Sequence, residues 1–175
     1  MDNITDRIEK QIRLRAKRSR VWKCIADSQE FGNWFGVIIE GPWKVGQKMN
    51  ARFEDRHTQE EIDGALAKIG LPTVPIAPVL SNVFCVVEAM EPETRFAFRW
   101  IPFGIEAGID PETEPKTLVE FLLVEEGDET VLSVTESGFD HVPLARRKRA
   151  FLMDSKGWGA QLKNIAEYLQ NLGEG

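Results

Sequence analysis

The sequence has few residues that could form cross-links or hold a metal. Its 175 residues include only two cysteines, Cys24 and Cys85, and two histidines, His57 and His141. The cysteines lie far apart within apolar stretches, which is typical of small buried thiols rather than of a disulfide framework. The histidines are distant in sequence from both cysteines, and no metal-ligand spacing occurs. We therefore predict no metal and no cofactor, and we expect a reducing, cytoplasmic setting.

The chain also lacks an excess of positive charge and any long hydrophobic run. Lys and Arg number 22 against 28 Asp and Glu, which gives a net charge of -6. An acidic chain has no overall field that attracts phosphate backbones or anionic lipid, so nucleic acid is a poor candidate partner. Neither a membrane span nor a signal peptide is indicated, because no apolar run has the required length. We expect a small molecule or another protein as partner.

The signatures of several familiar enzyme classes are missing as well. The sequence contains no glycine-rich phosphate-binding loop after a strand, no G-x-S-x-G elbow and no H-E-x-x-H helix. Its length suits one domain, residues 1–175, that buries a core without disulfides or a structural metal.

The first part of the chain predicts two strands separated by short helical segments. Apolar residues alternate with charged ones over residues 8–16, which indicates a half-buried strand. Ser19 should cap a short helix, and Gly32 should break the run that follows it. Residues 33–36 should form a turn with two large aromatic side chains. Alternation over residues 49–53 predicts the second strand.

The second part predicts a group of strands. Turn signals separate four segments of period two, namely residues 83–89, 95–100, 117–125 and 130–136. Gly127-Asp128 indicates a hairpin between the last two.

A long helix should follow Pro143, because the apolar period changes from two to three or four. Gly157 and Gly159 interrupt this helical pattern and predict a kink or a close approach of the helix to the sheet. The order of elements indicates an α+β fold in which the helix crosses a curved antiparallel sheet, with an apolar pocket in the gap between them. The apolar stripe consists of Phe151, Trp158, Leu162, Ile165, Leu169 and Leu172.

Short segments spread over nearly the whole chain agree in order and spacing with a known family. They are Ser19-Arg20-Val21-Trp22, Phe31-Gly32-Asn33-Trp34-Phe35, Glu91-Pro92, Arg95-Phe96-Ala97-Phe98-Arg99-Trp100, Thr117-Leu118-Val119-Glu120-Phe121, Glu136-Ser137-Gly138-Phe139, Gly157-Trp158 and Tyr168-Leu169. On these residues the chain resembles the SRPBCC or START-like superfamily, and within it the branch similar to the C-terminal domain of the activator of heat-shock protein 90 ATPase. The resemblance implies a helix-grip fold, with about six to seven strands wrapped around the C-terminal helix and two short helices after the first strand.

The superfamily includes lipid carriers, ligand binders, cyclases and chaperone activators, so the fold does not choose among functions. We expect a binding domain that holds a small hydrophobic or aromatic molecule between the sheet and the C-terminal helix. The alternatives are a co-chaperone-like module in the stress response, acting on a heat-shock protein 90 type ATPase, and a cyclase- or dehydratase-like enzyme. The residues expected to line the cavity are Trp34, Phe35, Phe53, Phe96, Phe98, Trp100, Phe121, Glu136, Trp158 and Leu162.

Glu136 is the one position where the pattern places a carboxylate toward the interior. A buried carboxylate without a partner acquires a raised pKa and becomes a candidate acid or base. In the enzyme alternative, Glu136, Arg99 or His141 would act as the acid or base. The simpler interpretation is that Glu136 accepts hydrogen bonds from a helix terminus or an arginine at the end of its strand.

Two charged or irregular segments remain. The basic run 146–149 should be a solvated start of the long helix whose charges pair with carboxylates of neighbouring loops. Residues 56–80 form an insertion in which Thr58 and Glu61 have capping-box spacing, so we expect a short helix followed by an extended proline-rich connector. Its apolar residues should pack on the cavity mouth or on a second copy of the chain, as in a homodimer.

Overall fold

The computed structural model describes residues 7–53, 57–77 and 82–171. These residues form seven strands, four α-helices and one short 3-10 helix, η1. In chain order the elements are β1 (Arg7–Leu14), α1 (Arg18–Ala26), α2 (Ser28–Phe35), β2 (Ile38–Ile39), β3 (Lys48–Arg52), α3 (Gln59–Lys68), β4 (Val83–Glu91), β5 (Arg95–Trp100), β6 (Thr117–Glu126), β7 (Glu129–Ser137), η1 (Phe139–His141) and α4 (Leu144–Asn171).

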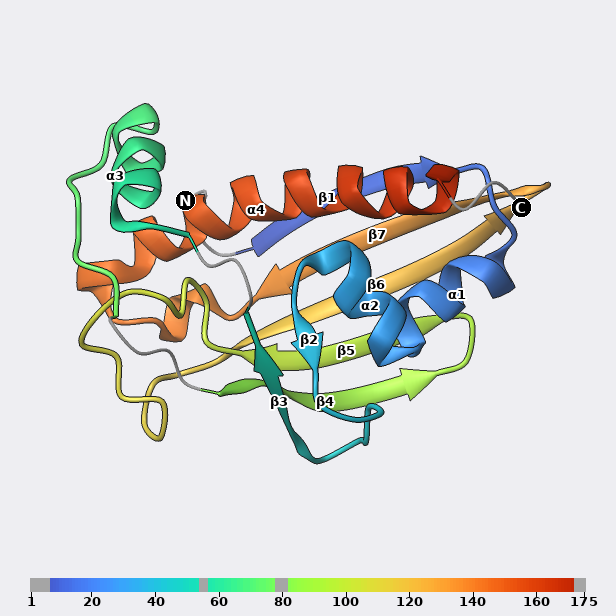
Figure 1. Ribbon diagram of the computed structural model, residues 1–175, viewed down its shortest axis with the longest axis horizontal. Helices are drawn as coiled ribbons and strands as arrows, with labels where there is room; N and C mark the ends of the chain where they lie inside the picture. Colours follow the sequence, from blue (N-terminus) through green and yellow to red (C-terminus); the bar gives the residue numbers. More distant parts are fainter. Residues whose placement is uncertain (1–6, 54–56, 78–81, 172–175) are drawn as a thin grey trace.

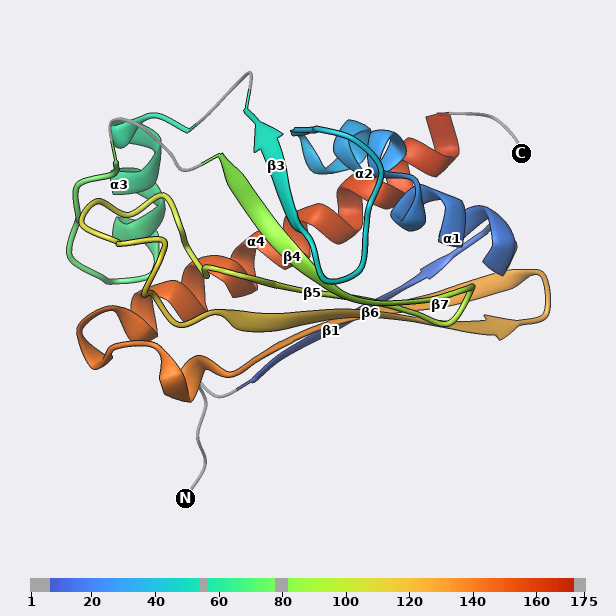
Figure 2. The ribbon, with the colours of Figure 1, turned by 90° about the horizontal axis from the view of Figure 1, so that it is seen from below.

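The strands form one curved antiparallel sheet in the order β1-β7-β6-β5-β4-β3-β2. Helix α4 runs along the sheet, and α1 and α2 lie beside it on the same side (Figures 1 and 2). The predicted α+β helix-grip architecture is therefore confirmed, including the number of strands and the two short helices after the first strand.

The core lies between this face of the sheet and helices α2 and α4. Alternation along β5 and β6 buries one set of side chains, with Phe96, Phe98 and Phe121 fully enclosed. Phe31 of α2 lies among them, with ring centroids 6.3 to 6.5 Å away. Most of the space between sheet and helices is therefore occupied by the protein's own rings.

The sequence-based description of residues 18–36 was wrong at the N-cap, at Gly32 and in the predicted turn over residues 33–36, since residues 33–35 belong to α2. Lys17, and not Ser19, is the N-cap of α1, and no side chain caps that helix. Gly32 does not break α2, which continues to Phe35 and ends at Gly36 in the left-handed region (φ 97). Gly32 instead allows close packing, since a Cβ there would lie 2.3 Å from the Val37 carbonyl oxygen.

Several other local predictions are confirmed. The four strands and the hairpin of the second part are confirmed, with Gly127 at φ 62 in the turn. Helix α3 begins with the predicted capping box between Thr58 and Glu61. Cys24 and Cys85 are free and buried as expected, and burial raises the pKa of the Cys24 thiol to about 12.

Helix α4 is continuous over its 28 residues. Trp158, Leu162 and Ile165 form its buried stripe, whereas Leu172 lies outside the described residues. The predicted close approach at the two glycines was wrong. A Cβ at Gly157 would meet nothing within 4 Å, and one at Gly159 would meet only the flexible end of Lys10 at 3.8 Å.

The described part of the insertion, residues 57–77, packs on the molecule itself. Helix α3 lies beside the N-terminal end of α4 (Figures 1 and 2). The connector after it pairs with the loop between β5 and β6, through Ala77 N to Ile105 O at 2.7 Å and Ala107 N to Pro75 O at 2.9 Å. The ends of the predicted insertion, at residue 56 and residues 78–80, lie outside the described residues.

Candidate functional site

Three polar or aromatic residues of neighbouring strands meet at one end of the concave face. Trp100 of β5 lies opposite Thr117 of β6, and Glu136 of β7 lies opposite Val119. Because Thr117 and Val119 are two residues apart, they share a face, and Thr117 becomes a diagonal neighbour of Glu136. The register therefore places all three side chains together.

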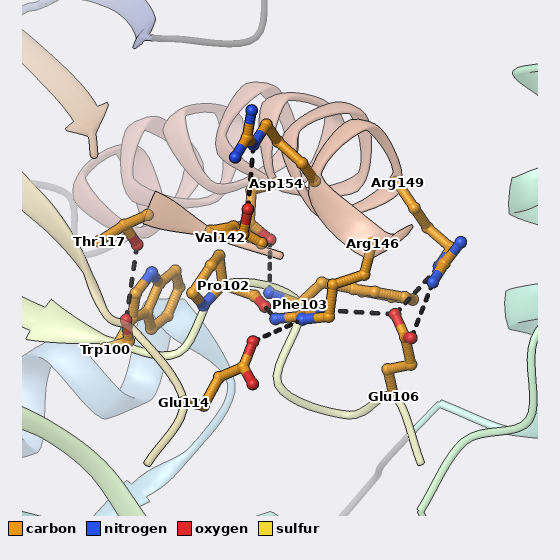
Figure 3. Close-up of polar contacts among 11 residues, drawn as sticks. Trp100, Pro102, Phe103, Glu106, Glu114, Thr117, Val142, Arg146, Arg149 and Asp154 are labelled. Atoms are coloured by element: carbon orange, nitrogen blue, oxygen red, sulfur yellow. Dashed lines mark hydrogen bonds and ion pairs between the residues drawn. The ribbon is translucent and has the colours of Figure 1, made fainter. Parts of the chain in front are cut away.

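Helix α4 brings two further side chains to the same place. Asp154 and Trp158 are four residues apart and so lie on one face of the helix. The Trp158 indole Nε1 donates to Glu136 Oε1 at 2.8 Å, which links the helix to the sheet. Asp154 Oδ1 accepts a hydrogen bond of 3.1 Å from the backbone N–H of Phe103 (Figure 3).

Glu136 is fully buried and accepts three hydrogen bonds. Besides Trp158, the donors are the indole Nε1 of Trp100 at 2.9 Å and the hydroxyl of Thr117 at 2.6 Å, both to Oε2. The predicted inward orientation of Glu136 is confirmed. The expectation of an arginine or a helix terminus as its donor was wrong, because all three donors are uncharged side chains.

Asp154 is held in its protonated form more strongly than an ordinary aspartate. Burial raises the pKa of its carboxyl well above the usual range, and the charge of Glu136 and a hydrogen bond to it raise that pKa further. Asp154 Oδ2 is buried and has no N–H or O–H donor among the described residues. The hydrogen bond between the Asp154 and Glu136 side chains requires a proton on one of them, since two carboxylates can hydrogen-bond only through a proton.

A small pocket opens beside this acid pair. Its volume is about 90 Å³, and α4 supplies most of its border. Gly157 forms part of the mouth and contributes no side chain. The rings of Trp100 and Trp158 stack with centroids 5.4 Å apart, and Phe35 meets them edge-on at 6.1 and 6.0 Å. The residues around the pocket are Phe35, Trp100, Met153, Asp154, Gly157, Trp158 and Gln161.

The structure brings together part of the predicted cavity lining. Phe35, Trp100 and Trp158 border the pocket, and Glu136 lies directly behind the two indoles. Phe53 lies apart from them, just after β3, and is 40% exposed. The remaining predicted residues are buried in the core around the pocket, and they are Trp34, Phe96, Phe98, Phe121 and Leu162.

Arg99 and His141, the other two candidate acids or bases, lie away from the pocket. Arg99 is on the outer face of the sheet and pairs with Glu88 at 2.6 Å. His141 is exposed beside Asp140. Sequence reasoning missed Asp154 and Thr117. For Asp154 a signal existed, because it is the only acidic residue one turn before Trp158 on the helix stripe.

A larger recess of about 660 Å³ lies at the surface between the α1–α2 junction and β2. Its polar side chains serve local structure. Asp27 caps α2 through the backbone N–H groups of Gln29 and Glu30, and the Ser28 hydroxyl donates to the Gly41 carbonyl at 2.7 Å. The recess therefore has no buried ionisable group comparable with the acid pair.

An ionic cluster holds the β5–β6 loop to the first turns of α4 (Figure 3). Arg146, with 7% of its side chain exposed, pairs with Glu106 at 3.3 Å and Glu114 at 2.9 Å and donates to the Pro102 carbonyl. Arg149 pairs with Glu106 at 2.8 Å. The predicted pairing with loop carboxylates is confirmed, but Arg146 is buried rather than solvated.

The described residues contain no group of three or more His, Cys, Asp or Glu side chains placed to hold a metal ion. Within the same residues, no helix has both the length and the apolar character needed to cross a membrane.

Solved structures share this fold. A protein from Mesorhizobium loti, MLL2253, superposes with a TM-score of 0.64 at 17% identity, covering 96% of this chain and 99% of that one. The Aha1 dimer from Colwellia psychrerythraea gives 0.62 at 16% identity, with 97% and 98% covered. DynU16, described as a putative protein in the dynemicin biosynthetic locus, gives 0.62 at 20% identity. This chain is covered to 94%, but it spans only 47% of DynU16.

A search of curated proteins gave no significant match. The sequence model of one family, described as activator of Hsp90 ATPase homolog 1-like protein, matches residues 15–170. This match covers most of the chain and agrees with the helix-grip fold. The chain therefore belongs to the activator of Hsp90 ATPase homolog 1-like family.

Proposed function

We propose that this protein binds a small aromatic or apolar molecule in the pocket beside Trp100 and Trp158. The observation that supports this proposal is the composition of the pocket, whose border includes three aromatic rings and one carboxyl group, that of Asp154, with its Oδ2 atom buried. Apolar walls with a few directed polar groups are typical of small-molecule sites. The volume of about 90 Å³ fits a single ring or a short branched chain rather than a long lipid.

The position of the pocket gives it a rigid floor and an open rim. Trp158 is fixed by its bond to Glu136, and Gln161 donates to the Phe35 carbonyl at 3.0 Å, which joins α4 to α2. Gly157 leaves the rim free of a side chain. A ligand at this point would contact α4, α2 and β5 at once.

Nuclear magnetic resonance of ¹⁵N-labelled protein tests this proposal. The indole N–H signals of Trp100 and Trp158 report on the pocket directly. Benzyl alcohol, titrated as a neutral aromatic probe, should shift these two signals and leave that of Trp43, bonded to the Ile25 carbonyl, in place. Gly157→Leu should prevent the shifts by filling the rim. The matched control Gly159→Leu should not, because Gly159 does not border the pocket. Unchanged Trp100 and Trp158 signals with every probe would refute the proposal.

The family description makes contact with a chaperone ATPase the second candidate function. The basic run 146–149 is one surface that such a contact could use, but its Arg146 and Arg149 already pair with loop glutamates inside the molecule. An interface would therefore use other surfaces, and it would survive Gly157→Leu. The solved Colwellia relative is described as a dimer, so analytical ultracentrifugation of this protein is the matching test for self-association.

A further inference from the structure

The acid pair carries a negative charge that no cation among the described residues neutralises. Apart from the proton that it shares with Asp154, Glu136 accepts hydrogen bonds from two indoles and a hydroxyl, all of them uncharged donors. In the described part of the chain, no ion pair joins Glu136 or Asp154 to a lysine, arginine or histidine. Buried charges are costly unless they are paired, so a lone buried anion beside an open pocket is an unusual arrangement.

The nearest ionic cluster does not supply the missing charge. Arg146 weakly favours the ionised form of Asp154 through its charge, but its own hydrogen bonds go to Glu106, Glu114 and the Pro102 carbonyl. Arg149 also pairs with Glu106. The positive charges of the two arginines are neutralised by the negative charges of Glu106 and Glu114. The charge of the Glu136–Asp154 pair is not neutralised by this cluster.

The rings around the pocket add a second feature suited to a cation. Trp100 and Trp158 both border the pocket, and Phe35 completes a three-ring wall. The face of an indole attracts a positive charge within about 6 Å of its centroid, and the attraction grows when water is excluded. Both indole N–H groups point to Glu136, so their hydrogen bonding is satisfied before any ligand arrives.

We propose that the ligand is a small organic cation, an ammonium group on an aromatic or short apolar body, whose charge lies between Asp154 and the Trp100–Trp158 pair. This inference rests on the proposed function and specifies its ligand class. The volume of about 90 Å³ restricts the body to the size of one ring.

Binding by this geometry exchanges a proton for the ligand. The ammonium ion pairs with the Asp154 carboxylate, and the proton that Asp154 shared with Glu136 leaves to solvent, so charge is conserved in the site. The groups that face Asp154 are Glu136 from the sheet and Arg146 from its own helix, the latter neutralised by the loop glutamates. Since the free protein holds the proton and the complex does not, affinity should rise with pH, approaching tenfold per unit below the pKa of Asp154.

Three probes of one shape test the charge. Benzylammonium, benzyl alcohol and benzoate are titrated separately against the Trp100 and Trp158 indole signals. We expect benzylammonium to bind about tenfold more tightly than benzyl alcohol, and benzoate to bind least. Benzylammonium stays protonated between pH 5.5 and 7.5, so the charge of the probe is constant over this range. Its affinity should increase with pH, while that of benzyl alcohol stays constant.

Asp154→Asn keeps the shape of the side chain but cannot release a proton to form the carboxylate that pairs with the ammonium group. This variant should lose the preference for benzylammonium and its pH dependence, yet still bind benzyl alcohol, which shows that it is folded. Asp128→Asn makes the same replacement in the exposed hairpin turn, away from the pocket, and should behave as wild type. Equal affinity for the cation and the alcohol would overturn the cation inference but keep the pocket. No shift with any of the three probes would overturn both.

Discussion

Two groups of buried carboxyls contact the same helix but are stabilised differently. At the first turns of α4, Glu106 and Glu114 meet Arg146 and Arg149, and each glutamate has an arginine partner. Two turns later, Glu136 has only uncharged donors. The first group closes a loop onto the helix, whereas the second lies beside a pocket.

The difference separates a structural role from a functional one. A charge-balanced cluster needs nothing further, and opening it would leave buried charges unpaired. An unbalanced cluster keeps a residual field, which is the property that a binding site for a charged ligand requires. The two groups should therefore respond differently to substitution.

The largest expected effect is on the balanced cluster. Arg146→Ala leaves Glu106 and Glu114 without their shared partner in a buried position, which should lower the free energy of unfolding by about 3–5 kcal/mol. Urea denaturation followed by circular dichroism measures this loss. Lys148 lies two residues further along α4 and is exposed, so Lys148→Ala should change the free energy of unfolding by less than about 0.5 kcal/mol. Similar values for both variants would show that the cluster is not buried as described.

A smaller effect is expected from one donor of the unbalanced group. Thr117→Val removes the hydroxyl that donates to Glu136 at 2.6 Å and should cost about 1.5–3 kcal/mol, the range for hydrogen bonds to charged groups. Thr130→Val is the matched control, because Thr130 is equally buried but donates to a neutral acceptor, the Ala16 carbonyl at 2.8 Å. It should cost about 0.5–1.5 kcal/mol.

The same urea titrations compare the two threonine variants. A larger loss for Thr117→Val supports a charged Glu136. If Thr130→Val were the more destabilising variant, Glu136 would have to be neutral, and the cation inference would lose its basis.

The fold could be predicted because its determinants are periodic and local. The alternating apolar residues of β5 and β6 and the apolar stripe of α4 correspond to buried faces. The capping box of α3 forms between the residues that the sequence predicted. The errors arose where contacts between distant residues, rather than the local sequence, determine the role of a residue. Gly32 has the identity of a helix breaker, but the approach of the Val37 carbonyl is what requires it, and that contact cannot be seen in the local sequence.

The candidate site could be predicted only in part, for a related reason. Period two placed Glu136 inside, but its partners come from β5, β6 and α4, which are up to 36 residues distant in the chain. Strand register and the rotation of α4 decide which of the many rings border the pocket. Phe53 shows the limit, since it continues the alternation of β3 but lies beyond the end of that strand and is exposed.

The smallest expected effect concerns the two glycines of α4, which differ in their relation to the pocket. Alanine at either position should raise helix stability by up to about 1 kcal/mol, because neither Cβ would meet a rigid neighbour. Thermal unfolding measures this gain. Only Gly157→Ala adds an atom at the rim of the pocket, so it alone should weaken the binding of benzylammonium. If both variants gain stability and only Gly157→Ala loses affinity, glycine at position 157 serves access to the pocket at the expense of the helix. A loss of stability in Gly157→Ala would instead mean that α4 packs more closely there than the open rim implies.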